Sequence, residues 1–230
     1  MWANSMQLTE LTRLLAESDF GAVVIDDFLP EDDFAEIRQH LINHWGWRYK
    51  NWTNGYLHNY HLDTGALDRT AERLSGPLSE AAGRPISRQA QWAILAHRDA
   101  GLKPHADNGS FVVNFWLTPD EYNLVPGSGG VVFYDVRRPE AIMSPEFQVT
   151  PQSDRYVSER TSGRKLEIPY RCNRATVFDA TVFHASAPIS FADEGAYSKR
   201  LNVSMVFDDP ALFDMRRERG LAEYAAGDAQ

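Results

Sequence analysis

The stretch KPHADNGSFVVNFWLT, residues 103–118, decides the fold class, because a polar, turn-rich start runs into the clearest strand pattern of the chain. It also carries the pair His105-x-Asp107 directly ahead of that strand. Two more His-x-Asp pairs occur, at residues 61–63 and 97–99. Such a pair alone therefore does not identify a site, and the rest of the chain has to single one out.

Residues 86–207 continue this pattern as short apolar segments separated by turn residues, which predicts a sandwich, barrel or jelly roll. Residues 1–85 read as helices and an aromatic segment that pack on this core, and residues 208–230 as a C-terminal helix that Asp209 and Pro210 begin. We therefore expect one domain over residues 1–230 that is mainly β with flanking helices.

Three segments have less regular patterns. Residues 66–83 predict a helix with a potential break at Gly76-Pro77. Residues 45–60 are aromatic and irregular, and residues 137–163 have weak periodicity, as expected of a long surface insert or a lid.

Composition narrows the function classes. The net charge of −9 argues against a surface that coats nucleic acid, although it leaves room for a local basic groove. The single cysteine, Cys172, cannot form an intrachain disulfide, which favours a reducing, cytoplasmic setting. The sequence contains no run of 18 apolar residues, so we expect no membrane span. Its first residues lack the pattern of a signal peptide.

The His-x-Asp spacing suits a metal that must keep positions open for other ligands. Two imidazoles and one carboxylate occupy one face of an octahedron and leave three positions free. Residues i and i+2 of an extended segment point the same way, so His105 and Asp107 can act together. The third ligand must come from another strand, and His184 is the only histidine after residue 105. Its alternative interpretation is a buried histidine that is hydrogen-bonded to backbone.

The segment KRLNVSMVF, residues 199–207, places Arg200, Asn202 and Ser204 on one face of a predicted strand. Such a row can hold a carboxylate inside a barrel, because arginine offers a bidentate fork and its neighbours add hydrogen bonds. The alternative is an ordinary solvated face.

These positions resemble the Fe(II)/2-oxoglutarate-dependent oxygenase superfamily, in which the order is His-x-Asp, a distal histidine and an arginine. The resemblance is nearest to the prolyl-hydroxylase-like and uncharacterised bacterial branches; it covers residues 86–207 and, weakly, the segment GAVVIDDFLPEDDFAEIRQHL ahead of them. It implies a double-stranded β-helix, a cupin-like jelly roll. It also implies Fe(II), 2-oxoglutarate and O2 as cofactors. The residues it implies are His105, Asp107 and His184 as iron ligands and Arg200 as the clamp on 2-oxoglutarate.

Three further residues are assigned to the co-substrate. Asn202 matches an asparagine that some relatives use for it, and Asn114 and Ser204 are expected to face the same cavity. Asn114 could equally be a polar residue on a half-exposed strand. One departure is that many prolyl-hydroxylase relatives carry a tyrosine just before the turn that precedes the first ligand, where this chain reads LAHRDAG.

The implied reaction is hydroxylation of an unactivated C–H in a small-molecule or amino-acid-like substrate, with succinate and CO2 as co-products. Asp107 fills the position that related halogenases leave to chloride, which disfavours halogenation. The alternatives are a peptidyl, prolyl-type hydroxylase, a zinc hydrolase, and a non-catalytic cupin-like module or metal-free ligand-binding sandwich. Arg98, Arg137 and Arg138 are either partners for an acidic substrate group or solvated. Candidate substrate contacts are Arg98, Trp45, Trp47, Tyr56 and His58. The alternative for the aromatic residues among them is that they cover the open side of the sheet.

Overall fold

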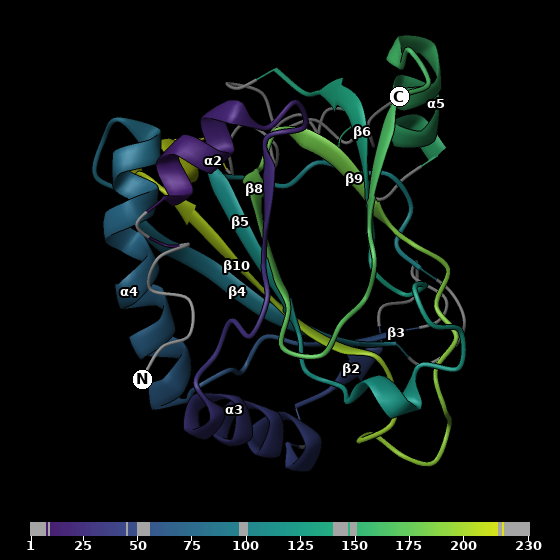
Figure 1. The fold of residues 1–230 in the computed structure, drawn as a ribbon. Coiled ribbons are helices and arrows are strands. Elements are labelled where there is room, and N and C mark those ends of the chain that lie inside the picture. Colours follow the sequence, from purple (N-terminus) through teal and green to yellow (C-terminus); the bar gives the residue numbers. More distant parts are fainter. Residues whose placement is uncertain are drawn as a thin grey trace.

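The computed structural model describes residues 8, 10–44, 46–49, 56–96, 101–139, 147, 151–215 and 218. Its core is two antiparallel β-sheets that face each other, the larger with seven strands and the smaller with three (Figure 1). The larger sheet has the order β1 (Ala22–Ile25), β8 (Ala175–Asp179), β5 (Phe111–Trp116), β10 (Leu201–Asp208), β4 (Ser87–Ala96), β3 (Tyr56–Asn59), β2 (Arg48–Tyr49). The smaller sheet has the order β7 (Lys165–Ile168), β6 (Val131–Arg137), β9 (Val182–Ser186). The prediction of a mainly β core with flanking helices is confirmed.

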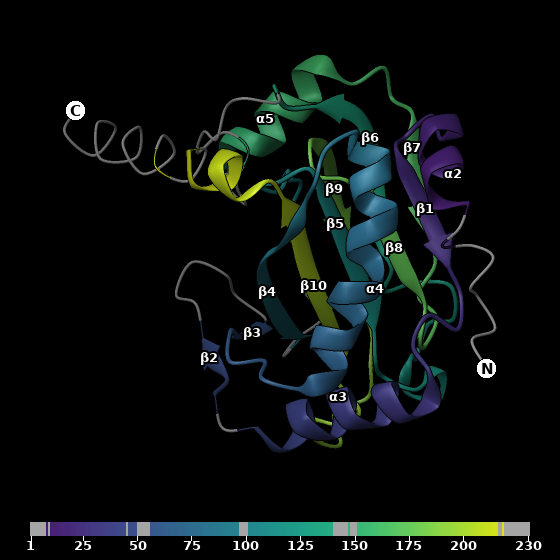
Figure 2. The ribbon, with the colours of Figure 1, turned by 90° about the vertical axis from the view of Figure 1, so that its left-hand side faces the viewer.

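The helices α2 (Leu11–Glu17), α3 (Glu31–Asn43) and α4 (Gly65–Ala82) precede or interrupt the strands of the larger sheet. In Figure 2, α4 lies across the face of that sheet, and α3 lies across its lower end. Alternate strand residues such as Phe115, Val203 and Met205 pack against these helices in one apolar cluster. The opposite residues face the smaller sheet in a second cluster, which joins Val112 and Phe178 to Phe133.

The helix α4 is continuous, so the break considered at Gly76-Pro77 does not occur. Leu74 and Leu78, on either side of Pro77, are fully buried against the core, and this packing outweighs the hydrogen bond that proline removes. The side chain of Thr64 caps the start of the helix by accepting from the Leu67 amide. Gly83 ends it with φ +65°, a conformation that glycine adopts without strain.

The aromatic segment is more regular than its sequence indicated. β2 and β3 form a hairpin, and β3 pairs with β4, so this segment extends the larger sheet. Aromatic residues often form strands because their side chains pack well on a pleated surface. Trp45 and residues 50–55 of the segment lie outside the described residues.

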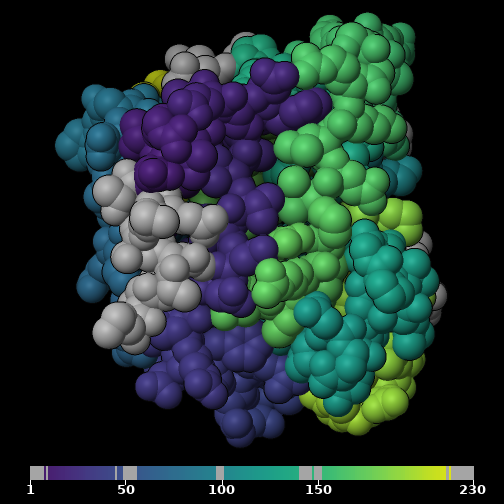
Figure 3. Space-filling view, in the orientation of Figure 1, coloured from purple at the N-terminus to yellow at the C-terminus, as the bar shows by residue number. Residues whose placement is uncertain are grey.

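The described part of the insert at residues 137–163 contains the helix α5 (Pro151–Arg160). Val157 of α5 and Phe147 pack with Phe183 and Ala106 in a third apolar cluster, on the outer side of the smaller sheet. Near the C-terminus, residues 210–215 are helical, and Asp209 accepts from the amides of Ala211 and Leu212, as predicted for its cap. In the space-filling view, the purple N-terminal part of the chain and the green segment that contains β7 lie side by side on the face turned toward the viewer (Figure 3). No helix in the described part of the chain is long and apolar enough to cross a membrane.

Candidate active site

The side chains of the neighbouring residues His105 and Asp107 meet that of the distant His184 in a cavity between the sheets. A ligand atom from each of His105, Asp107 and His184 lies within 4.8 Å of the other two. The Nε2 atom of His184 is 3.5 Å from Oδ2 of Asp107, and the two imidazole centroids are 4.3 Å apart. Among the described residues, no other group of three or more histidine, cysteine or acidic side chains could hold a metal ion. This separates His105-x-Asp107 from the other His-x-Asp pairs, as far as those are described.

Backbone pairing holds the two histidines together. The His105 amide donates to the His184 carbonyl at 2.9 Å, and the His184 amide donates to the His105 carbonyl at 2.8 Å. This bridge extends the edge of β9 to the segment ahead of β5. The topology therefore brings His184 to His105 and Asp107, which sequence spacing alone does not show.

Both imidazole rings are oriented by hydrogen bonds on the same side of the ring. Nδ1 of His105 is 2.8 Å from the Lys103 carbonyl, and Nδ1 of His184 is 3.1 Å from the Val182 carbonyl. Because a carbonyl only accepts, each Nδ1 carries the proton and each Nε2 keeps a lone pair for a metal. Burial, together with the neighbouring His105, lowers the pKa of His184 to about 4, so this ring is neutral at physiological pH.

Arg200 occupies another part of the same cavity and is 5% exposed. Its Nε atom donates to the Gly129 carbonyl at 2.5 Å and an Nη atom donates to Oδ1 of Asn202 at 2.7 Å. Burial lowers the pKa of Arg200 to about 10, which leaves the guanidinium charged at neutral pH. Within the described part of the chain, none of its ion pairs or hydrogen bonds involves a carboxylate. A buried cation whose partners are all neutral is costly unless an anion joins it.

The polar row of β10 lies on the cavity side of the larger sheet. Asn202 stands opposite Ile94 of β4, while Ser204 stands opposite Asn114 of β5. The Asn114 side-chain amide donates to Oγ of Ser204 at 2.8 Å. Asn202 and Ser204 are 2% and 4% exposed, so the solvated-face interpretation is wrong. Asn114 is only partly buried and lines the same cavity, as expected.

Sequence reasoning missed most of the apolar wall of this cavity. Trp92 and Ile94 alternate with residues that face the helices, and this period of two could have identified them. Leu102 and Gly130 lie in turns, where no periodicity applies. The apolar lining consists of Trp92, Ile94, Leu102, Val112, Val131, Phe178 and Ala185.

The predicted substrate contacts are placed differently from one another. Tyr56 and His58 are buried on β3, and His58 stands opposite Ile94, on the cavity side of the sheet. Trp47 packs instead against the helix-side core and donates its Nε1 to the Leu41 carbonyl, so the structure moves it away from the substrate wall. Trp45 and Arg98 lie outside the described residues.

Neither arginine of the insert lines the cavity that contains His105, Asp107 and His184. Arg137 forms an ion pair with Asp179. Arg138 is 3% exposed and donates to backbone carbonyls of the loop that carries Asp107. The interpretation of a solvated side chain therefore holds for Arg137 and not for Arg138, and a contact with an acidic substrate group stays a prediction.

No protein-family model matches the sequence, and no curated protein matches it. Solved structures share the fold. The epimerase SnoN from nogalamycin biosynthesis, described as non-heme and alpha-ketoglutarate dependent, superposes with a TM-score of 0.60 at 17% identity, over 89% of this chain and 84% of SnoN.

Two prolyl hydroxylases are similar as well. The enzyme from Trichoplax adhaerens gives a TM-score of 0.54 at 15% identity, over 93% of this chain and 96% of its own. The prolyl-4-hydroxylase from Pseudomonas putida gives 0.56 at 13% identity, over 88% and 99%. The chain therefore has the jelly-roll fold of the Fe(II)- and 2-oxoglutarate-dependent oxygenases.

Proposed function

We propose that this protein is a non-haem Fe(II)- and 2-oxoglutarate-dependent dioxygenase that hydroxylates an unactivated C–H bond. The observation that carries the proposal is one cavity lined both by the group His105, Asp107 and His184 and by the buried guanidinium of Arg200. The metal group alone is compatible with several functions. A buried cation without a carboxylate partner beside it calls for an anionic ligand that binds at the same time.

The donor set fits Fe(II). Two imidazoles and one carboxylate form the facial set typical of iron oxygenases and leave positions for a bidentate co-substrate and O2. The Nδ1 hydrogen bonds of His105 and His184 fix the ring orientation, so that the Nε2 atoms are available as ligands.

The other end of the cavity fits a dicarboxylate. Arg200 has donors left after its bonds to Gly129, Gly130 and Asn202, because a guanidinium carries five. Asn202 orients the guanidinium, and we propose that Ser204 and Asn114 complete the polar side of this subsite. SnoN has been solved with Fe3+ and alpha ketoglutarate, which supports the same pair of ligands here.

When bound, iron with 2-oxoglutarate and O2 supplies oxidative decarboxylation to succinate and CO2 and the oxidation of a substrate C–H bond. The residues of this chain bind and orient. Arg200 holds the distal carboxylate, which sets the direction of the keto acid toward the ligand group. The apolar wall around Trp92 and Phe178 excludes water from the reacting centre.

We propose a small-molecule or amino-acid-like substrate that approaches along β3. His58 lies two strands from Asn202, a separation of about 10 Å, and forms an aromatic patch with Tyr56 and the half-exposed Tyr60. SnoN was solved with nogalamycin RO and the Trichoplax enzyme with a peptide fragment, so a peptidyl substrate is the second candidate.

A zinc hydrolase or a cupin-like metal-binding module explains the metal group but gives no role to Arg200. A metal-free binding sandwich explains neither. These alternatives separate in one assay: the purified protein, Fe(II), 2-oxoglutarate and O2 are incubated with substrate pools, and succinate and +16 Da products are measured by mass spectrometry. The proposal expects succinate that depends on Fe(II) and disappears with His105→Ala. An assay without Fe(II)-dependent succinate for any pool would contradict it.

A further inference from the structure

The loop that carries two of the three ligands is held from the side opposite the cavity. We call residues 103–109 the metal loop. Its backbone runs from Lys103 to Gly109, and Gly109 adopts φ +127° beside Val206, where a Cβ atom would lie 2.4 Å from Cγ1 of that valine. A loop with such a tight turn is not fixed by strand pairing alone, so its contacts decide where Asp107 points.

Arg138 grips the second half of the metal loop. Its Nε atom donates to the Asp107 carbonyl at 2.9 Å, and an Nη atom donates to the Gly109 carbonyl at 3.3 Å. Another Nη atom donates to the carbonyl of Pro139. The Arg138 amide in turn donates to the Thr181 carbonyl, which anchors the arginine to the turn before β9. The segment that leads into β9, the strand of His184, and the loop that carries Asp107 are thus linked through one buried residue.

The middle residue of the motif is held by the third apolar cluster. Ala106 is 2% exposed, and its amide donates to the Phe147 carbonyl at 2.8 Å. Its methyl group packs with Phe147, Val157 and Phe183. Because neighbours in an extended segment point in opposite directions, burying Ala106 on the outer side turns His105 and Asp107 toward the cavity.

The first half of the metal loop is held by α5. Oγ of Ser153 donates to the Pro104 carbonyl at 2.5 Å, and Ser153 is fully buried. Lys103 and Asp154 form an exposed ion pair at 3.4 Å, which adds little. Ser153 therefore holds Pro104, which directly precedes His105. The residue before it, Lys103, supplies the carbonyl that orients the His105 ring.

We infer that Arg138, Phe147 and α5 form a buttress that pre-positions the metal ligands, and that Arg138 and Ser153 are positioning residues for metal binding. The inference rests on the proposed function, since it concerns how the metal group is held. The described part of the insert, which sequence reasoning treated as a potential lid, acts from behind the metal site. Backbone groups of Pro104, Ala106, Asp107 and Gly109 bind to this one segment, whereas a merely covering helix would contact exposed side chains only.

The test measures metal affinity instead of turnover. Co(II) is titrated into the metal-free protein and its visible d–d absorption is recorded for wild type, Ser153→Ala, Arg138→Gln and Arg138→Lys, with folding checked by circular dichroism. Residues that orient metal ligands typically contribute 10–100-fold to affinity, so we expect about tenfold weaker binding for Arg138→Gln and about threefold for Ser153→Ala. Arg138→Lys should recover part of the loss, because an ammonium can replace one of the donors.

Ser158→Ala is the matched control. Ser158 lies on the same helix and donates only to the Arg155 carbonyl on the exposed side, so its replacement should leave Co(II) affinity within twofold of wild type. A second readout is hydrogen exchange of the 103–109 backbone, which Ser153→Ala should accelerate and Ser158→Ala should not.

The outcomes separate the two proposals. The Co(II) spectrum of wild type should disappear in His184→Ala. If wild type gives no such spectrum, or if His184→Ala keeps it, the proposed function fails and the buttress fails with it. If wild type binds Co(II) but Ser153→Ala and Arg138→Gln bind equally well, the buttress alone is overturned. If Arg138→Gln does not fold, the Co(II) affinities of Ser153→Ala and Ser158→Ala are compared instead. Weaker binding by Ser153→Ala alone supports the buttress, and equal binding overturns it.

Discussion

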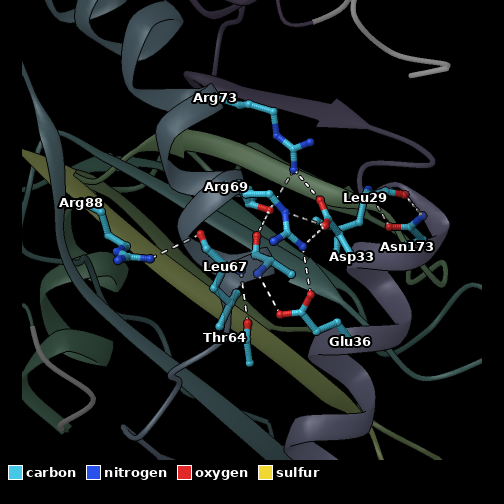
Figure 4. A network of polar contacts seen from close by, with 11 residues as sticks. Leu29, Asp33, Glu36, Thr64, Leu67, Arg69, Arg73, Arg88 and Asn173 are labelled. Carbon is cyan, nitrogen blue, oxygen red and sulfur yellow. Dashed lines mark hydrogen bonds and ion pairs between the residues drawn. The ribbon is translucent and has the colours of Figure 1, made fainter.

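Two buried charge clusters in this protein are built in opposite ways. Between α3 and α4, Asp33 is 5% exposed and accepts from Arg69 at 2.6 Å and from Arg73 at 2.7 Å (Figure 4). Glu36 joins the cluster by accepting from Arg69 and from the Ala66 amide. At the cavity, Arg200 is equally buried, yet its partners are two backbone carbonyls and Asn202.

This difference in hydrogen-bond partners distinguishes a cluster that stabilises the fold from the proposed binding site of 2-oxoglutarate. The Asp33 cluster is complete in itself, because the buried carboxylate has two cations and both cations reach solvent. The buried Arg200 side chain keeps its charge, and none of its hydrogen-bond partners among the described residues is a carboxylate. Such an arrangement is stable at a cost, and an incoming dicarboxylate removes that cost. The comparison predicts that the two clusters fail in different assays.

The largest effect is expected for Arg200→Met. Removing one partner of a buried charge pair typically costs about 2–5 kcal/mol of binding, so 2-oxoglutarate affinity should fall at least about 30-fold. Metal affinity should be unchanged, because Arg200 is not a ligand. Equilibrium binding of labelled 2-oxoglutarate to the metal-loaded protein measures the first, and Co(II) titration measures the second. Equal 2-oxoglutarate affinity in the variant would remove Arg200 from the binding site.

The reverse result is expected for Asp33→Asn. The variant leaves two guanidinium groups without their shared carboxylate, and charged hydrogen bonds of this kind contribute about 1.5–3 kcal/mol each before solvent compensates the exposed partners. We expect the free energy of unfolding to fall by about 2 kcal/mol in urea titrations, with unchanged 2-oxoglutarate affinity. A loss of 2-oxoglutarate affinity with intact stability would erase the distinction between the clusters.

The stability difference between wild type and Asp33→Asn should depend on pH. Burial raises the pKa of Asp33, but hydrogen bonds from Arg69 and Arg73 outweigh it and hold this pKa below the ordinary value of 3.8. A carboxyl with a depressed pKa in the folded state stabilises above 3.8 and loses this contribution as pH falls through the folded-state pKa. Urea titrations should therefore show the full difference at pH 7 and a smaller one at pH 3. A difference that is constant over this range would contradict the ion-pair assignment.

The smallest effect concerns the stability of Arg200→Met without ligands. Replacing a buried charge by an apolar side chain of similar length removes its desolvation cost and its hydrogen bonds together, and such exchanges are often near neutral. We expect a change in unfolding free energy of less than about 1 kcal/mol. A loss comparable to that of Asp33→Asn would show that Arg200 is mainly structural.

The sequence predicted the β core and the residues of the candidate site for a physical reason. His105 and Asp107 precede a strand with a clean period, and Arg200, Asn202 and Ser204 alternate on another. In such segments the side-chain direction follows from position alone. The match of His184 to this pair needed only the assumption that two strands meet, which the His105–His184 bridge bears out.

Other features of the structure could not be predicted from the sequence, because they depend on contacts between distant segments. The direction of Trp47 is set by the helix side of the core, and that of Arg138 by carbonyls of the metal loop. The helix α4 continues through Pro77 because Leu74 and Leu78 are buried, and burial is a property of the assembled fold. The aromatic segment showed no clear period in the sequence, although residues 56–59 pair with β4 and form a strand.

The most direct test of the account is the visible spectrum of the Fe(II) protein under anaerobic conditions as 2-oxoglutarate is added. If the keto acid chelates iron while Arg200 holds its distal carboxylate, a weak metal-to-ligand charge-transfer band should grow and saturate in wild type and in Asp33→Asn. In Arg200→Met the band should need at least about 30-fold more 2-oxoglutarate, and in His184→Ala it should be absent. No band in wild type at saturating Fe(II) and 2-oxoglutarate would contradict the central claim.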